Sequence, residues 1–397
     1  MSRALLYLHT IRHLTPHQAI AQIRYRAVRR LRPMPPPYRG ASAPARGLRL
    51  PPGSPREPCF EPPAAFTFLE SGADFGEGVD WRAQDMPRLW RYQLHYFDCL
   101  RQSELPVAEG ERLIASWIES DGGRCADAWD PYPTATRLVN WARWYALRGA
   151  EPPAAVRRSV ARQAAWLRSR LERHLLGNHL IRNASGLTHA GGLLGGQEGD
   201  CWMIEGLSLL SEQVGAQVLP DGGHEERSPM YHSLVLEDLL DVLEVARAGR
   251  PSLAGTTASL DERFERIAES ARMMSCFLDG FRHPDKEIPL FNDSAFGVAS
   301  PAVVLLERAE RIAGWRKGSA GRTAPLHHWP ATGAFRIDAR RSRMLLDAGP
   351  IGPDHQLGHA HADTFSFELS VDGQRVVVDT GVSTYEPGPI RFAALMA

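Results

Sequence analysis

The chain has 397 residues, 43% of them hydrophobic and 8% aromatic, which is enough for one large globular domain and part of another. Its 46 basic residues balance 46 acidic ones, so no overall field attracts it to nucleic acid, although a local basic patch is compatible with this balance. No apolar run is long enough for a transmembrane helix. The N-terminus has neither the apolar length nor the cleavage site of a signal peptide, and the cytoplasm is the expected default location.

The first segment combines a basic helix with a loop. Residues 14–32 predict a short helix with Ile20, Ile23 and Val28 on one side and arginines around them. A role at a membrane surface is one interpretation of such a helix. We favour the other, in which the apolar side packs on the domain and the arginines are solvated. Residues 33–65 are rich in Pro, Gly and Ala, which predicts a loop or a strap across the surface.

The middle of the chain is helical. From about Arg88 to Gly314, apolar residues recur at helical spacing and short Gly/Pro breaks interrupt them. Normal helix lengths allow roughly eight to ten helices in this stretch. Helix hairpins of this kind stack as a bundle, a solenoid or an α/α toroid, and periodicity alone does not choose among the three.

The pattern changes after Trp329. Residues 365–371 alternate strictly between apolar and polar, an Asp-Gly pair follows at 372–373, and a β-branched run comes next. This is the strongest short-range signal for a β-hairpin. A weaker hairpin joins residues 335–338 to residues 344–347. Helices first and strands afterwards indicate two segregated domains, and few strands with an unpaired last edge indicate an incomplete sheet.

The first of four polar clusters opens a helix. It reads Gly177-Asn178-His179 and leads into an apolar helical run. Asparagine is a good N-cap, because its side-chain oxygen accepts a hydrogen bond from a first-turn amide. A cap followed by a solvent-exposed histidine is therefore the alternative to a functional pair.

The second cluster lies at a loop-to-helix junction. It spans residues 221–232 and includes Arg227, Tyr231 and His232. Tyr231 and His232 lead directly into an apolar helix, so a rigid element would hold them, as catalytic groups require. A solvated loop is the alternative.

The third cluster is a polar trio that follows an apolar pair. Asn292, Asp293 and Ser294 come directly after Leu290 and Phe291. This arrangement resembles the edge of a pocket, which makes Asn292 and Asp293 candidate substrate contacts.

The fourth cluster precedes the alternating strand. His359 and His361 stand two residues apart, and in extended chain such residues point to the same face. One histidine could then serve chemistry while the other binds a metal. Zinc needs three or four N, O or S ligands, and His361 with Asp379 on the partnering strand supplies two of them. A histidine-rich loop without metal is the alternative.

Taken in this order, the four clusters resemble the heparinase II/III-like polysaccharide lyases over nearly the whole chain. The asparagine–histidine motif of that family is similar to residues 177–180, and its catalytic-tyrosine motif is similar to residues 227–232. The start of its β-sandwich and metal site is similar to residues 358–363 and 378–381. Each motif alone is weak, but all of them in register are specific.

The resemblance implies a mainly α fold, in which an incomplete α/α toroid is followed by a truncated antiparallel β-sandwich. We expect residues 1–66 to form the basic helix and Pro-rich surface segment. Residues 67–325 would form the toroid and residues 326–397 the start of the sandwich, with a sugar-binding cleft between the two. The implied reaction is β-elimination across the C4–O4 bond of a uronate.

The resemblance also implies roles for four catalytic residues. Asn178, helped by His179, would neutralise the uronate carboxylate and so stabilise the enolate-like intermediate. Tyr231 would donate a proton to the leaving oxygen, and it could also act as base in one stereochemical series. His359 would be a base or an acid from the sandwich side. Tyrosine titrates at about pH 10 in water, so a tyrosine base would need a cationic neighbour that lowers its pKa.

The other candidates are Arg227, His232, Asn292 and Asp293 as substrate contacts, and His361 and Asp379 as ligands of a structural zinc ion. A further histidine from the later sandwich completes the metal site of the family, and truncation would remove it here. The implied partner is an anionic polysaccharide, with neither nucleic acid nor an integral membrane segment. By the same resemblance, the periplasm is the alternative location.

Two other functions stay open. A truncated relative could bind polysaccharide without turnover. A metal-dependent hydrolase would use His359, His361 and Asp379. Hydrolysis has no need of an Asn-His pair and a tyrosine on helices, which favours the lyase.

Overall fold

The structure is a computed structural model that describes most of the chain. The described residues are 16–32, 34–38, 40, 43–250, 257–318, 325–353, 358–362, 364–382, 384–385, 388–389 and 391. Within these ranges, no helix combines the length and the apolar character that crossing a membrane requires.

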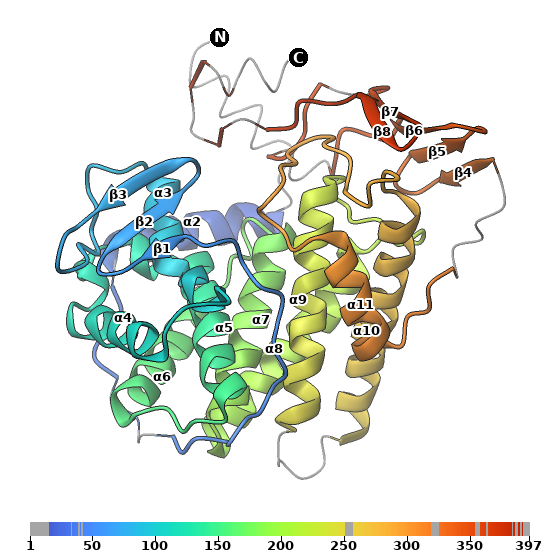
Figure 1. Ribbon diagram of the computed structural model, residues 1–397. Coiled ribbons are helices and arrows are strands. Elements are labelled where there is room, and N and C mark those ends of the chain that lie inside the picture. Colours follow the sequence, from blue (N-terminus) through green and yellow to red (C-terminus); the bar gives the residue numbers. More distant parts are fainter. Residues whose placement is uncertain are drawn as a thin grey trace.

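The described residues form ten α-helices. These are α2 (Pro16–Leu31), α3 (Arg88–Tyr96), α4 (Val107–Glu119), α5 (Pro131–Arg148), α6 (Ala154–Arg168), α7 (Gly177–Leu193), α8 (Gly196–Gln217), α9 (Pro229–Ala248), α10 (Thr257–Gly280) and α11 (Ala302–Ala313). Figure 1 shows α7 to α10 side by side, with α3 to α6 curving round beyond α7. The predicted helical run is confirmed, and its arrangement is an α/α toroid.

Two of these helices are buried almost all round. α7 buries every residue except His179, and α9 buries every residue from Pro229 to Ala246 except Tyr231. A helix that is buried on all sides must lie between layers of other helices. His179 and Tyr231 both lie in the first turn of their helix, so each helix is partly exposed to solvent at its N-terminal end.

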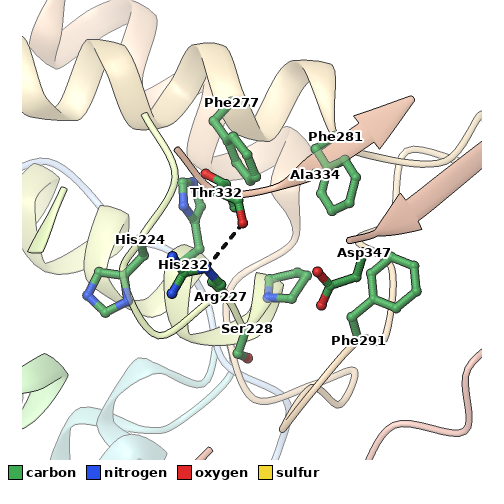
Figure 2. Close-up of a pocket in the computed structure, with 11 residues that line it drawn as sticks. His224, Arg227, Ser228, His232, Phe277, Phe281, Phe291, Thr332, Ala334 and Asp347 are labelled. Carbon is green, nitrogen blue, oxygen red and sulfur yellow. Dashed lines mark hydrogen bonds between the residues drawn. The ribbon is translucent and has the colours of Figure 1, made fainter. Parts of the chain in front are cut away.

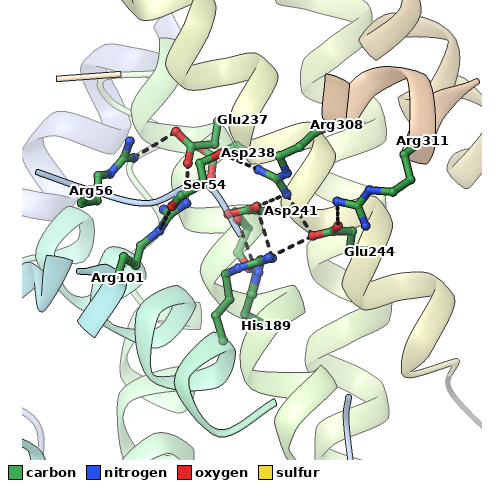
Figure 3. A network of polar contacts seen from close by, with 12 residues as sticks. Ser54, Arg56, Arg101, His189, Glu237, Asp238, Asp241, Glu244, Arg308 and Arg311 are labelled. Atoms are coloured by element: carbon green, nitrogen blue, oxygen red, sulfur yellow. Dashed lines mark hydrogen bonds and ion pairs between the residues drawn. The ribbon is translucent and has the colours of Figure 1, made fainter. Parts of the chain in front are cut away.

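Buried ion pairs hold α9 in the middle of the helical body (Figure 3). The pairs are Arg56–Glu237 (2.9 Å), Arg101–Glu237 (2.6 Å), Arg143–Asp241 (3.2 Å), Arg308–Asp241 (2.6 Å) and Arg308–Glu244 (2.9 Å). Burial alone would raise the pKa of Glu237, but Arg56 and Arg101 lower it to about 2. A buried charge left without its partner is strongly destabilising, so these contacts fix distant segments of the chain to α9.

Two antiparallel sheets accompany the helices. Their strands are β1 (Phe60–Glu61), β2 (Ala65–Phe68) and β3 (Ser71–Asp74) in one sheet, and β4 (Leu326–Trp329), β5 (Ala334–Asp338), β6 (Ser342–Asp347), β7 (Phe367–Val371) and β8 (Gln374–Val377) in the other. In Figure 1 the five-stranded sheet lies above one end of α9 and α10. Asp372 and Gly373, between β7 and β8, have φ of 53° and 85°, as a type I′ turn requires. Both predicted hairpins are confirmed.

Strand β7 points its polar residues inward. Glu368 and Ser370 are buried, and His283 lies 3.0 Å from the first and 2.7 Å from the second. Phe365 and Phe367 are 72% and 44% exposed. His283 supplies a hydrogen-bonding partner for these buried polar groups. The polar residues of the alternating segment therefore face inward, and Phe365 and Phe367 face outward.

The orientation of α2 differs from the favoured interpretation. Tyr25 stacks on His174, and Arg29 pairs with Asp130 at 3.0 Å. Ile20, on the other side, is 66% exposed. The expectation that the apolar side packs on the domain is wrong, because the polar side finds partners there.

Removing an arginine from the α9 network should destabilise the protein strongly. Arg308→Met leaves Asp241 and Glu244 short of a partner, and we expect the free energy of unfolding to fall by about 3–5 kcal/mol. Arg341→Met is the control, because the Arg341–Asp372 pair is exposed to solvent and such pairs contribute little. Urea unfolding curves measure both variants. Equal losses would contradict the role of the network.

Candidate active site

Three segments meet between the helical body and the five-stranded sheet. They are the first turn of α7 with Asn178 and His179, the first turn of α9 with Tyr231, and residues 358–362 with His359. Glu226 joins Asn178 to His359, and His359 packs on Tyr231, so contacts link all three segments. The structure therefore brings together the four residues that were predicted to be catalytic.

Tyr231 and His359 face each other across the junction. Their ring centroids are 3.9 Å apart and their planes are inclined by 38°. Ser228 fixes the tyrosine by capping α9, since its Oγ accepts a hydrogen bond from the Tyr231 amide at 3.3 Å. The same hydroxyl donates to the Asp293 carbonyl at 2.9 Å, which ties the start of α9 to the loop that faces it.

The phenol of Tyr231 keeps its proton. Burial raises the pKa of Tyr231 well above its usual value, and Tyr385, Tyr132, Asp293 and Glu226 raise it further. A tyrosine base would need a neighbouring cation, and none of these described groups supplies one. This environment fits a proton donor and speaks against Tyr231 as the base.

Asp293 holds two histidines and an arginine. Its carboxylate oxygens lie 3.0 Å from His359 Nδ1 and 2.7 Å from His361 Nε2, and Arg391 also pairs with it. Burial alone would raise the pKa of Asp293, but these donors hold it well below its usual range. An ionised carboxylate only accepts hydrogen bonds, so Nδ1 of His359 donates to Asp293, and Nε2 is the ring nitrogen on the side of Glu226. Asp293 therefore orients His359, and its predicted contact with the substrate stays a prediction.

Glu226 connects α7 to His359. It is buried, and it accepts hydrogen bonds from the Asn178 amide at 2.9 Å and from Asn178 Nδ2 at 3.0 Å, while His359 Nε2 lies 3.7 Å away. Burial would raise the pKa of Glu226, but His224, His359 and Asn178 outweigh it, and the pKa lies below its usual value. Gly177 makes room for this carboxylate, because a Cβ at that position would stand 2.3 Å from Glu226 Oε1.

His179 has a carboxylate partner of its own. Its Nδ1 lies 3.2 Å from Glu172 Oε1, and its ring lies 4.7 Å from the ring of Tyr132. Asn183 fixes Glu172 through a hydrogen bond of 2.9 Å. Burial lowers the pKa of His179, but Glu172 more than offsets this and the pKa lies above its usual value. Glu172 thus favours the protonated form of His179, and 31% of the His179 side chain is exposed.

Arg227 and His232 line a small crevice together with Phe277 and Thr332 (Figure 2). The crevice that they share has a volume of about 20 Å³, which suits a water molecule and not a sugar. Arg227 Nε donates to the Thr332 carbonyl at 3.1 Å, and His232 Nε2 lies 3.0 Å from the Met274 carbonyl. Arg227 thus braces the loop before β5 and His232 belongs to the core, and substrate contact by either residue stays a prediction.

Asn292 is a support for the histidine loop. Its Oδ1 accepts a hydrogen bond from the His361 amide at 3.1 Å, and its Nδ2 donates to Asp347 at 3.2 Å. Asn292 is 3% exposed, and substrate contact by this residue stays a prediction.

The two predicted zinc ligands are each hydrogen-bonded within the protein. His361 is engaged by Asp293, and Asp379 accepts a hydrogen bond from the Gly381 amide at 2.8 Å. In the part of the chain that the structure describes, no three His, Cys, Asp or Glu residues are placed to hold a metal ion. Zinc needs three or four ligands, so zinc binding by His361 and Asp379 stays a prediction, and we assign no chemical step to a metal.

Five residues of the site were not among those predicted: Tyr132, Glu172, Glu226, Tyr385 and Arg391. Glu226 stood inside the second polar cluster, where an acidic residue just before a capped helix was the available signal. The other four reach the site from remote segments and have no local signature.

The fold is thus an α/α toroid joined to an antiparallel β domain, with a tyrosine and a histidine facing each other at the junction. The family model "Heparinase II/III N-terminus" matches residues 155–307, and the model "Heparinase II/III-like, C-terminal" matches residues 321–395. The chain belongs to the heparinase II/III-like family.

Solved structures share this fold. The crystal structure of heparinase III matches with a TM-score of 0.61 and 21% identity, covering 81% of this chain and 56% of that one. A heparan sulfate lyase mutant from Pedobacter heparinus matches with a TM-score of 0.56 and 19% identity, covering 83% and 56%. At these identities the likeness concerns the fold alone.

Curated relatives carry two kinds of name. The heparin-sulfate lyase of Bacteroides thetaiotaomicron is 31% identical over 119 residues, which are 30% of this chain and 17% of that protein. FtsZ-localized protein C of Caulobacter vibrioides is 26% identical over 317 residues, covering 77% of this chain and 50% of that protein. The chain thus spans half or less of the length of these two relatives.

Replacing Glu226 tests whether it holds Asn178 in place. Glu226→Gln brings amide N–H groups against the Asn178 donors, and we expect the free energy of unfolding to fall by about 1–3 kcal/mol. Glu262→Gln is the matched control, because Glu262 is exposed on α10. Chemical denaturation measures both variants, and an unchanged stability of Glu226→Gln would rule out this hydrogen-bonding role.

Proposed function

We propose that this site cleaves a uronate-containing anionic polysaccharide by β-elimination. The pairing of Tyr231 with His359, at 3.9 Å between ring centroids, supports this most directly. The phenol is a proton donor, and the imidazole has a nitrogen free to accept a proton. β-Elimination needs one group of each kind, a base for the C5 proton and an acid for the leaving oxygen.

The reaction transfers two protons, one from C5 to His359 and one from Tyr231 to O4. His359 Nε2 removes the C5 proton, the C5–H electron pair forms the C4=C5 double bond, and the C4–O4 bond breaks. Tyr231 gives its phenolic proton to O4. Asp293 and Glu226 stabilise the resulting imidazolium, because their carboxylates lie 3.0 Å and 3.7 Å from its two nitrogens. Return of a proton from His359 to Tyr231 through solvent restores the starting state.

The uronate carboxylate must be neutralised before C5 becomes acidic. The raised pKa and partial exposure of His179 suit it to this task. Asn178 adds an uncharged donor with two N–H groups, and Glu226 sets the direction of its amide. We assign the carboxylate to His179 and Asn178 together.

The substrate class rests on chemistry and on the relatives. A protonated His179 and the pair of Tyr231 and His359 would together fit a uronate, which has a carboxylate next to the C5 proton. Relatives named heparin-sulfate lyases make heparan sulfate the first polymer to examine, followed by alginate, hyaluronan and bacterial exopolysaccharides.

Binding of a polysaccharide without turnover is the second candidate. FtsZ-localized protein C aligns with 77% of this chain, and its name refers to FtsZ and not to a lyase. Metal-dependent hydrolysis has less support, because the described residues include no cluster of three metal ligands.

The ultraviolet absorbance of an unsaturated uronate tests the lyase directly. We expect the chain to generate it from at least one of these polymers. Tyr231→Phe should lower kcat by about 10²–10⁴-fold, because the leaving O4 loses its acid. Tyr38→Phe is the matched control, since Tyr38 pairs with Glu198 on the surface, away from the site.

Two results would count against the proposal. Absorbance that persists in Tyr231→Phe at the rate of Tyr38→Phe would remove Tyr231 from the reaction. Polymer binding by the unaltered chain without absorbance would favour the second candidate.

A further inference from the structure

Helix α2 presents an apolar stripe to solvent. Ile20, Ile23 and Leu31 are 66%, 70% and 81% exposed, and Ala27 between them is exposed as well. Spacings of three and four residues place all four on one face of the helix. The apolar face of a surface helix ordinarily packs on the core, so this reversed orientation points to a partner outside the described structure.

The opposite side of α2 is fixed to the helical body. Tyr25 stacks on His174 at 4.0 Å between ring centroids, and its hydroxyl donates to Asp130 at 3.4 Å. Arg29 pairs with Asp130 at 3.0 Å, and Gln18 is buried. α2 cannot turn its isoleucines inward without losing these contacts.

Arginines border the stripe. Arg24, Arg26 and Arg30 are exposed, and α2 contains no acidic residue. The whole chain has no net charge, so this helix is a local basic patch. An apolar stripe bordered by arginines is typical of helices that lie in the plane of a membrane interface.

We propose that α2 docks on an anionic lipid surface. The isoleucines would enter the boundary between headgroups and acyl chains, and the arginines would pair with lipid phosphates. A second copy of α2 would bring arginines against arginines. A soluble polyanion would engage the arginines but leave the isoleucines in water. Only three large apolar side chains insert, so the binding is weak and reversible, and it is independent of the proposed lyase function.

Vesicle sedimentation with the full chain tests this docking. We expect binding to phosphatidylcholine vesicles that contain phosphatidylglycerol, little binding to pure phosphatidylcholine, and weaker binding at high salt. Ile20→Ser with Ile23→Ser should lower the partition coefficient at least about tenfold. Arg24→Gln with Arg30→Gln should lower it about fivefold for each arginine.

Val107→Ser with Leu147→Ser is the matched control, because these residues are also exposed on helices, at 52% and 45%. Urea unfolding confirms that every variant folds. The proposal fails if the isoleucine variant binds like the control, or if only the arginine variant loses binding, which would indicate electrostatic adsorption. It also fails if the isoleucine variant changes the oligomeric mass in solution, which would make a second copy the occupant.

Discussion

Buried ion pairs between carboxylates on α9 and arginines from distant segments hold the helical body together. Glu237, Asp241 and Glu244 lie inside the helical body, where a carboxylate without a partner would be strongly destabilising. The arginines that pair with them come from four separate segments of the chain (Figure 3), so these pairs tie all four segments to α9. Because α9 carries Tyr231 in its first turn, the same contacts fix the position of the proposed acid.

Buried carboxylates paired with hydrogen-bond donors also organise the candidate active site. Glu226 and Asp293 are buried carboxylates that face the side chains proposed to be catalytic, and in the proposed reaction neither touches the sugar. Glu226 sets the direction of the Asn178 amide, and Asp293 fixes the tautomer of His359. Groups held in this way need little reorganisation when charge develops in the transition state. The candidate site therefore consists of two buried carboxylates, Glu226 and Asp293, behind the partly exposed side chains of His179, Tyr231 and His359.

Sequence patterns between neighbouring residues predicted the secondary structure correctly. They did not predict contacts between segments that are far apart in the chain. The Asp-Gly turn at 372–373 and the helical run needed only neighbours along the chain. The resemblance predicted Asn178, Tyr231 and His359, which the structure brings together. His232 was predicted to contact the substrate as a neighbour of Tyr231 in sequence. A helix turns about 100° per residue, so adjacent residues face different surroundings, and His232 lies in the core. The orientation of α2 failed for a related reason, since its polar side finds partners on segments more than 100 residues away.

The proposed reaction assigns the base to His359 and the acid to Tyr231, and exchange of the uronate C5 proton distinguishes these two roles. In D₂O, with oligosaccharides of heparan sulfate or alginate, NMR follows the C5 signal in variants that lack one partner. Tyr231→Phe retains the base, so we predict exchange of C5–H for deuterium without an unsaturated product. His359→Ala should show neither exchange nor product. Exchange in His359→Ala and none in Tyr231→Phe would make the tyrosine the base and contradict this account.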